Sequence, residues 1–196
     1  MAGHERRPAP GLAPDAQGGH AVPAPLTLRP LTPADAPTIA SWAGDPVFVA
    51  GAGWTPTLSP AAHVAFQLNL ITNPPPELIR LGAVENGDLV GYVDLHGTEP
   101  ARRELGYVIG DSRRWGRGLG GAAARAGLTH GFGELGLTHI WAEAEPTNTA
   151  SIRILRSLGM TELEPDPHRR FEISFEAWRV RSSGHGEGLS GCGYGG

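Results

Sequence analysis

Lysine is missing from this chain of 196 residues, since all 16 of its Lys and Arg positions are arginine. Schiff-base chemistry and catalysis by a lysine nucleophile are therefore excluded. Cysteine occurs once, at Cys192, which excludes an intramolecular disulfide framework and a zinc site built on several cysteines. We expect no metal site and interpret Cys192 as an incidental exposed thiol.

Long apolar runs and an excess of positive charge are missing as well. No apolar run approaches the roughly 18 residues of a membrane span, and the N-terminal region lacks the apolar segment of a signal peptide. The formal net charge of −4 excludes a broadly basic protein that binds nucleic acid through bulk electrostatics. We therefore expect a cytoplasmic protein with no nucleic-acid or membrane partner.

Hydrophobic residues make up 40% of the chain, which is enough for a core. The 29 glycines and 18 prolines concentrate toward the two ends. We expect a flexible leader at residues 1–25, one domain at 26–181 and a disordered Gly- and Ser-rich tail at 182–196.

Hydrophobic patterns and turn signals predict an α+β domain with the element order βααβββαβαβ. Leading hairpins and a single late crossover favour a mixed sheet over a doubly wound one. Asn86-Gly87 is a strong hairpin signal, and Thr32-Pro33 and Ser59-Pro60 are typical helix starts. The segment 44–56 is expected to be a loop. The predicted strands are 26–32, 79–85, 89–97, 104–110, 139–145 and 171–178. Four helices are predicted. The first starts at Pro33, and the second starts at Pro60 with Val64, Leu68 and Ile71 at helical spacing; the third ends near Phe132, and the fourth spans 149–158.

A glycine-rich segment, Arg113-Arg114-Trp115-Gly116-Arg117-Gly118-Leu119-Gly120-Gly121, joins a predicted strand to a predicted helix. Glycines allow a ligand close to the backbone, and a helix N-terminus offers unpaired N–H groups and a positive dipole end. The combination is typical of a pyrophosphate site. A tight turn with glycines for close packing is the plainer alternative.

The same glycines also satisfy the dinucleotide-binding pattern G-x-G-x-x-G, with Glu143 near the position of a ribose-binding acid. In that pattern the first glycine follows its strand almost at once, whereas residues 111–115 intervene here. Only about 65 ordered residues follow Gly116, too few for a doubly wound sheet. The length of the chain therefore argues against a dinucleotide-binding oxidoreductase.

Two motifs in the right order give the chain its clearest resemblance, which covers residues 26–178. Arg113-x-x-Gly116-x-Gly118 resembles the (Gln/Arg)-x-x-Gly-x-(Gly/Ala) acetyl-CoA loop of the Gcn5-related N-acetyltransferase (GNAT) superfamily. Asn148-x-x-Ser151-x-x-x-Leu155-x-x-Leu158-Gly159-Met160 is similar to a helix motif of its ribosomal-protein serine/alanine N-terminal acetyltransferases, the RimJ/RimL-like branch. Glu104-Leu105-Gly106-Tyr107 fits the same branch.

The resemblance implies the GNAT fold, a mixed and mostly antiparallel sheet with two splayed central strands between helices. It also implies acetyl-CoA as co-substrate. One backbone N–H, of Val108 or Ile109, would polarise the thioester carbonyl, and both backbones would pair with the pantetheine arm. Asn148 would bind the pantetheine or bracket the acceptor, although it can also be read as a helix N-cap. The implied coenzyme-binding residues are Val108, Ile109, Arg113, Gly116, Arg117, Gly118, Leu119, Gly120, Gly121 and Asn148.

The acid and base residues stay open at this point. Glu143 lies five residues before Asn148, where some N-terminal acetyltransferases have their base, and Glu104 is the second candidate. For either, a solvated or salt-bridged surface carboxylate is the alternative. Many superfamily members carry a tyrosine that protonates the leaving thiolate where this chain has Leu155. Ser151 is then the available hydroxyl.

The sequence therefore predicts an N-acetyltransferase that moves an acetyl group directly to a primary amine within a ternary complex. The acceptor is either a protein N-terminus or a small-molecule amine, and Phe48, Trp54 and Trp141 are expected at its site. The alternatives are a non-catalytic acyl-CoA-binding or sensing domain and an acyltransferase that uses a different acyl-CoA. A homodimer is a further possibility.

Overall fold

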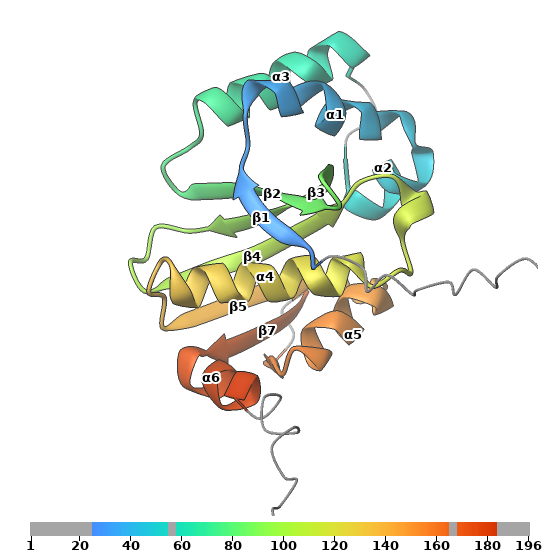
Figure 1. The fold of residues 1–196 in the computed structure, drawn as a ribbon. Helices are drawn as coiled ribbons and strands as arrows, with labels where there is room; N and C mark the ends of the chain where they lie inside the picture. Colours follow the sequence, from blue (N-terminus) through green and yellow to red (C-terminus); the bar gives the residue numbers. More distant parts are fainter. Residues whose placement is uncertain (1–24, 55–57, 165–167, 184–196) are drawn as a thin grey trace, which may run out of the picture.

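The computed structural model describes residues 25–54, 58–164 and 168–183 (Figure 1). In that part, seven strands form one sheet in the order β1-β2-β3-β4-β5-β7-β6. Only β4 and β5 are parallel, so the predicted mixed, mostly antiparallel sheet is confirmed. The strands are β1 (Thr27–Pro30), β2 (Leu78–Glu85), β3 (Asp88–His96), β4 (Arg102–Ile109), β5 (His139–Ala144), β6 (Thr161–Glu162) and β7 (Arg169–Ser174).

The helices begin where the sequence supplies caps. Ser59 Oγ accepts a hydrogen bond from the Ala62 N–H (3.2 Å), and Asn148 Oδ1 accepts one from the Ser151 N–H (3.0 Å). The predicted cap role of Asn148 is confirmed. The α-helices are α1 (Ala36–Ser41), α2 (Pro46–Ala52), α3 (Pro60–Thr72), α4 (Leu119–Gly133), α5 (Thr149–Ser157) and α6 (Phe175–Ser183); short 3₁₀ turns span Pro33–Asp35, Trp42–Gly44 and Ser112–Arg114.

The predicted hairpin between β2 and β3 is confirmed. Asn86 and Gly87 have φ angles of 52° and 88°, the left-handed backbone that the favoured two-residue hairpin turn requires. The turn sets the register in which Arg80 lies opposite Asp94, and Asp94 in turn lies opposite Gly106 on β4.

The prediction of a loop at 44–56 is wrong, because α2 occupies its centre. Asp45 caps this helix by accepting hydrogen bonds from the N–H groups of Val47 and Phe48. Pro46 stands at the first helical position, and Gly53 ends the helix in a left-handed conformation (φ 66°). The Gly and Pro residues that suggested a loop are the start and stop signals of a short helix.

The predicted final strand at 171–178 is also corrected, since β7 ends at Ser174 and α6 follows. The face of α3 differs as well. Its buried residues are His63 and Gln67, whereas Leu68 is 39% exposed. The predicted leader at 1–25 lies outside the described residues except for Pro25, and the predicted tail overlaps them only at Ser182 and Ser183 of α6.

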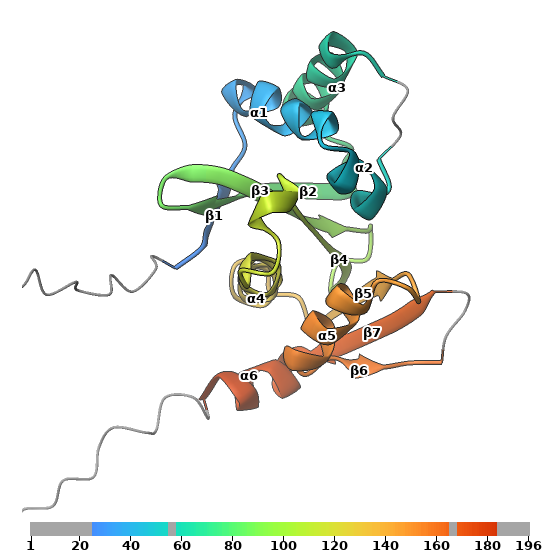
Figure 2. The ribbon, with the colours of Figure 1, turned by 90° about the vertical axis from the view of Figure 1, so that its right-hand side faces the viewer.

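Helices cover the sheet on both faces, as Figures 1 and 2 show: α4 packs on one face, and α1 and α3 on the other. Glycines allow α4 to lie close to the strands. A Cβ on Gly127 would stand 2.7 Å from Leu105 of β4, and one on Gly131 would stand 2.6 Å from Ile140 of β5. The larger core cluster lies on the α4 side, and a smaller one of Ile39, Trp42, Phe48 and Tyr92 lies under α1.

The central parallel strands diverge (Figure 2). They pair only at Arg102–His139, Arg103–Ile140 and Glu104–Trp141, although β4 continues to Ile109 and β5 to Ala144. We call the stretch beyond the last pair the splay. It matches the splayed central strands expected from the resemblance.

Candidate active site

The glycine-rich segment leads from the splay to α4. Gly116 and Gly118 have φ angles of +76° and +85°, which L side chains rarely adopt. Within the described residues, nothing lies within 4 Å of a Cβ placed on Gly116, Gly118 or Gly121. Gly118 is the N-cap of α4, so the N–H groups of the first turn have no partner within the helix and point out of its N-terminal end. The predicted anion site is thus a bare backbone at a helix N-terminus.

The segment is anchored just before these glycines. Asp45 of the α2 cap accepts a hydrogen bond from the Ser112 N–H (2.7 Å), and this donor, with others, lowers the pKa of Asp45 to about 2. Trp115 Nε1 donates to the Ile109 carbonyl oxygen (2.9 Å). Arg113 pairs with Asp111 and remains 87% exposed, so it can meet an anion at the surface. Arg117 is exposed as well.

Backbone groups of β4 are directed alternately to its two neighbours. The Gly110 N–H donates to the carbonyl oxygen of Val90 in β3 (2.9 Å), and two residues earlier Val108 lies opposite Tyr92 of the same strand. Alternation therefore turns the N–H of Val108 toward β3. The N–H groups of Tyr107 and Ile109 turn toward β5, which has already diverged. Of the two expected oxyanion donors, Ile109 fits this geometry and Val108 does not.

Glu104 lies at the last β4–β5 pair, where the splay begins. Its carboxyl group is half-buried, and no hydrogen bond or ion pair to it occurs among the described residues. Burial is the main cause that raises the pKa of Glu104, and the neighbouring Glu143 carboxylate raises it further, against smaller opposing effects of His96 and Arg170. A carboxylate with a raised pKa and no partner is suited to accept a proton.

Glu143 has a different environment. Arg170 of β7 donates to its Oε1 (2.5 Å), and His168 Nδ1 lies 3.4 Å from its Oε2. The guanidinium groups of Arg102 and Arg170 lie 5.5 and 4.9 Å from the ring centre of Trp141. Glu143 is thus the salt-bridged carboxylate that the sequence analysis gave as an alternative, and Trp141 lies between two arginines.

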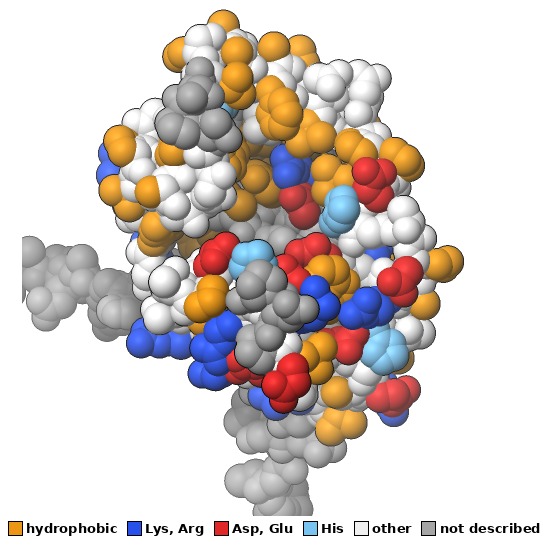
Figure 3. All heavy atoms as spheres, turned by 180° about the vertical axis from the view of Figure 1, so that it is seen from behind, with side chains coloured by type: hydrophobic (Ala, Val, Ile, Leu, Met, Phe, Trp, Pro, Cys, Tyr) orange, Lys and Arg blue, Asp and Glu red, His pale blue; other side chains and the backbone are white. Residues whose placement is uncertain are grey.

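Charged side chains share one face of the sheet around the splay. Residues directly opposite each other point to the same face, and so do residues two positions apart on one strand. Asp94 lies opposite Gly106, two positions after Glu104, so Asp94 and Glu104 lie on the same face. Asp94 is held by a two-bond ion pair with Arg80 (2.7 and 2.6 Å). Gly106, opposite Asp94, leaves the centre of β4 without a side chain there. Figure 3 shows this face hollowed between the α2–α3 part and the β5–β7 part, with acidic, basic and histidine side chains in and around the hollow. We call it the charged groove.

On the other face, α5 begins beside the splay. Asn148 caps it, which fixes the Ser151 backbone. Tyr107 of β4 is the residue that sequence reasoning missed. Its hydroxyl oxygen is fully shielded from solvent and has no hydrogen-bond partner among the described residues. Burial raises the pKa of Tyr107, and the nearby Ser151 hydroxyl has a smaller effect that lowers it.

The expected exposure of Phe48 at the acceptor site is wrong, because Phe48 is completely buried. It packs edge-on against Trp54 (ring centres 5.0 Å apart), and Trp54 stacks on His63 of α3 (5.8 Å). Trp54 is partly exposed. Phe48 therefore packs behind Trp54 as part of the smaller core cluster.

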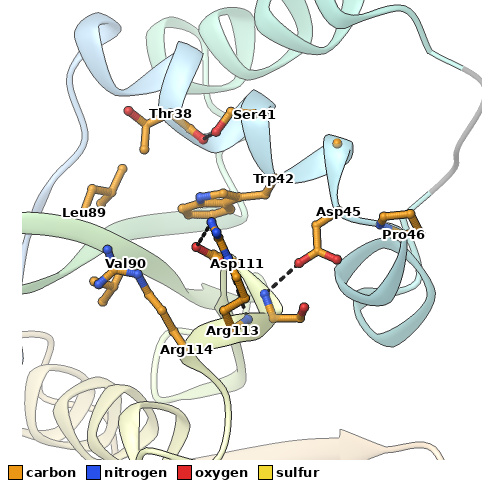
Figure 4. Close-up of a pocket in the computed structure, with 13 residues that line it drawn as sticks. Thr38, Ser41, Trp42, Asp45, Pro46, Leu89, Val90, Asp111, Arg113 and Arg114 are labelled. Atoms are coloured by element: carbon orange, nitrogen blue, oxygen red, sulfur yellow. Dashed lines mark hydrogen bonds and ion pairs between the residues drawn. The ribbon is translucent and has the colours of Figure 1, made fainter.

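A cavity of about 580 Å³ opens on the other side of the anchored segment (Figure 4). Trp42 forms its centre, with Thr38 and Ser41 of α1 above and Arg113 and Arg114 below. It lies at the far end of β4 from Glu104, so it is separate from the carboxylates near the splay.

Among the described residues, no helix is long and apolar enough to cross a membrane. Within the same part of the chain, no group of three or more His, Cys, Asp or Glu residues could hold a metal ion.

Comparisons with known proteins assign the family. The family model "Acetyltransferase (GNAT) domain" matches residues 25–161. An uncharacterized N-acetyltransferase, p20 of Bacillus licheniformis, is 30% identical over 138 residues, which cover 68% of this chain and 77% of p20. The chain belongs to the GNAT acetyltransferase family, and it is an acetyltransferase.

Solved structures share the fold. An aminoglycoside acetyltransferase, AAC(6')-Ib in complex with coenzyme A, has a TM-score of 0.69 at 20% identity, over 80% of this chain and 99% of that one. The spermidine/spermine N-acetyltransferase SpeG of Vibrio cholerae has a TM-score of 0.62 at 18% identity, over 81% and 98%. The expected GNAT fold is confirmed.

Proposed function

We propose that the protein transfers the acetyl group of acetyl-CoA directly to a primary amine, with both substrates bound at once. The observation that supports this most is the position of the splay, with the bare glycine backbone at one end and Glu104 at the other. A direct transfer suits a chain whose single cysteine, Cys192, is far along the sequence from all these residues.

Coenzyme A fits the first part of this arrangement. The backbone N–H groups of Gly116 to Gly121 would hold the pyrophosphate, with Arg113 and Arg117 beside it. The β5-facing backbone of Tyr107 and Ile109 would pair with the pantetheine arm, and one of these β5-facing N–H groups, of which that of Tyr107 is the nearer to Glu104, would stabilise the oxygen on which negative charge develops. A solved structure with the same fold, AAC(6')-Ib, is in complex with coenzyme A.

Glu104 is the general base that we favour over Glu143. An amine acceptor must lose a proton, and Glu104 has a raised pKa and no salt bridge, whereas Glu143 forms a salt bridge with Arg170. Glu143 would instead orient Arg170 and Trp141 around the acceptor.

The acceptor that we propose is a small cationic amine. Arg80 and Arg170 neutralise Asp94 and Glu143, so Glu104 is the carboxylate of this part of the charged groove that favours a positively charged ligand, and Gly106 leaves room for that ligand at the centre of β4. Aminoglycosides and polyamines are acceptors of this kind, and AAC(6')-Ib in complex with kanamycin shares the fold. Membership of the RimJ/RimL-like branch, which would make the acceptor a protein N-terminus, stays a prediction, as do a homodimer and a cytoplasmic location.

Thiol release from acetyl-CoA tests the proposal. The panel would contain an aminoglycoside, a polyamine, an amino acid and peptides that begin with Ser or Ala, together with a longer acyl-CoA as donor. We expect at least about tenfold faster thiol release with a cationic amine than without amine, and slower release from Glu104→Gln. Turnover with the peptides alone would favour membership of the N-terminal acetyltransferase branch, with a protein N-terminus as acceptor. Acetyl-CoA binding without turnover on any acceptor would favour a sensing domain.

A further inference from the structure

Trp115 is an exposed aromatic residue of the glycine-rich segment whose ring contacts two different elements. It is 41% exposed, which leaves much of a large apolar ring at the surface. Its Nε1–H donates to the Ile109 carbonyl oxygen at the end of β4 (2.9 Å). The far edge of the ring lies against Gly51 of α2, where a Cβ would stand 2.6 Å from Trp115 Cη2. The ring therefore occupies space that only a glycine leaves open on α2.

The helix α2 contacts the same stretch of chain at its other end. Asp45, which caps α2, accepts a hydrogen bond from the Ser112 N–H (2.7 Å), as Figure 4 shows. Gly51 belongs to the last turn of α2, so the first and the last turn of this seven-residue helix both contact residues 112–115. A shift of residues 112–115 would therefore move α2 as a unit.

The contacts of α2 continue toward the charged groove. The Trp54 N–H donates to the Val49 oxygen of α2 (3.0 Å), which fixes Trp54 relative to the helix. Trp54 packs against the smaller core cluster, of which Tyr92 is a member. Tyr92 lies two positions before Asp94 on β3, so both point to the face of the charged groove. Arg80, which pairs with Asp94, lies 3.9 Å from the ring centre of Tyr92.

We propose that Trp115 couples the two substrate sites through α2, an inference that rests on the proposed binding of coenzyme A at the glycines. The N–H groups of residues 116–121 can all donate to a pyrophosphate only in one backbone arrangement, so binding restricts a stretch that its glycines otherwise leave free. Trp115, directly before this stretch, then holds α2 and Trp54 in place on the acceptor side. Trp115 is a positioning residue, because it acts through α2.

The coupling works in both directions. Bound coenzyme A raises the affinity for the amine, and by thermodynamic linkage the bound amine raises the affinity for coenzyme A by the same factor. The free energy of the coupling comes from restricting α2 once, so the second substrate meets a wall that is already ordered.

Hydrogen exchange read by mass spectrometry tests the coupling without any acceptor. In the wild type, saturating coenzyme A should slow amide exchange both at residues 116–121 and in α2. Trp115→Leu removes the indole N–H and the ring edge, and Gly51→Ala displaces the ring from the α2 side. In both variants residues 116–121 should still be protected, whereas the protection of α2 should fall at least about fivefold.

Two matched variants serve as controls. Gly133→Ala repeats the glycine substitution at the end of α4, where none of the described residues lies within 4 Å of a Cβ. Phe66→Leu removes an exposed aromatic ring from α3. Both should keep the wild-type protection of α2. Gly51→Ala also raises the helix propensity of α2, so a loss of protection there cannot come from a weaker helix.

Steady-state kinetics supplies a second readout. The KM for the best amine of the thiol-release panel should rise at least about fivefold in Trp115→Leu and in Gly51→Ala, by more than kcat falls. Equal protection of α2 in the wild type and both variants, or no protection of α2 in the wild type, would overturn the proposal. Absence of protection at residues 116–121 in the wild type would instead overturn the coenzyme site on which it rests.

Discussion

Glu104 and Glu143 show how two carboxylates on one face acquire different roles. They belong to neighbouring strands at the splay, and the Glu143 carboxylate helps to raise the pKa of Glu104. Arg170 reaches Glu143 from β7, 27 positions along the chain, whereas among the described residues Arg170 and His96 act on Glu104 only at longer range and form no ion pair with it. Hydrophobic alternation could identify the face that both share, but the partner of each depends on β7, whose register no local pattern predicts.

Glu104→Gln should lower kcat/KM by about 10²- to 10⁴-fold, the usual effect of losing a positioned base. In the wild type, the raised pKa of Glu104 means that activity should fall as the pH drops through it, because the base becomes protonated. That limb of the pH profile should vanish in Glu104→Gln, and a high pH should partly restore its activity by supplying free amine. Initial rates across pH measure both effects.

Glu143→Gln is the matched comparison, with a smaller expected loss and an acidic limb that persists but moves to lower pH, because the Glu143 charge that raises the pKa of Glu104 is gone. If Glu143→Gln abolished the limb and Glu104→Gln preserved it, the base would belong to β5 instead.

Gly118→Asp should weaken acetyl-CoA binding at least tenfold, or about 1.4 kcal/mol. The substitution puts a negative side chain into the open space where the pyrophosphate is proposed to bind, next to the α4 N-terminus. Gly136→Asp is the control, since Gly136 also has a positive φ (+65°) and open surroundings but lies between α4 and β5. Calorimetric titration of the two folded variants decides, and equal affinities would remove the glycine segment from the site.

At the scale of elements, the secondary structure was predictable wherever a local signal was complete. Asn86-Gly87 specified the β2–β3 hairpin, and Ser59-Pro60 specified the start of α3. The helix α2 was missed although Asp45, Pro46 and Gly53 mark its two ends, because it is only seven residues long and its glycines suggested a loop. The buried face of α3 was unpredictable, since His63 is buried by stacking on Trp54 of another element.

The junction of β1 and α1 depends on one ion pair. Asp35 accepts hydrogen bonds from Arg29 of β1 (2.8 and 2.7 Å) and from the Thr32 N–H (2.7 Å). Arg29 is the main cause that lowers the pKa of Asp35 from 3.8 to about 2. The stabilisation is therefore complete above pH 3.8 and is lost as the pH falls through 2.

Asp35→Asn should lower the free energy of unfolding by about 1 kcal/mol near neutral pH, or Tm by about 3 °C. The difference from the wild type should shrink as the pH falls from about 4 toward 2, where both proteins lack the ionised carboxylate. Thermal unfolding followed by circular dichroism across this range would test it. A difference that stays constant with pH would mean that Asp35 acts through packing instead.

At the scale of the whole molecule, the composition of the two ends supports a prediction on truncation. Residues 1–22 and 185–196 are rich in Gly, Ala, Pro and Ser and supply little apolar surface for burial. We expect their removal to leave Tm nearly unchanged. Thermal unfolding of the full chain and of residues 23–184 makes the comparison, and a loss of several degrees would show that an end docks on the domain.

The divergence of β4 and β5 has a consequence for the order of substrate addition. The glycine segment and the start of α5 lie toward one side of the diverging strands, and Glu104 with Asp94 lies on the face that carries the hollow of Figure 3. Donor and amine then arrive by separate routes, and neither has to leave before the other can enter. If the proposed donor and acceptor sites are right, we expect random addition, with the product coenzyme A competing with acetyl-CoA and leaving the route of the amine unobstructed.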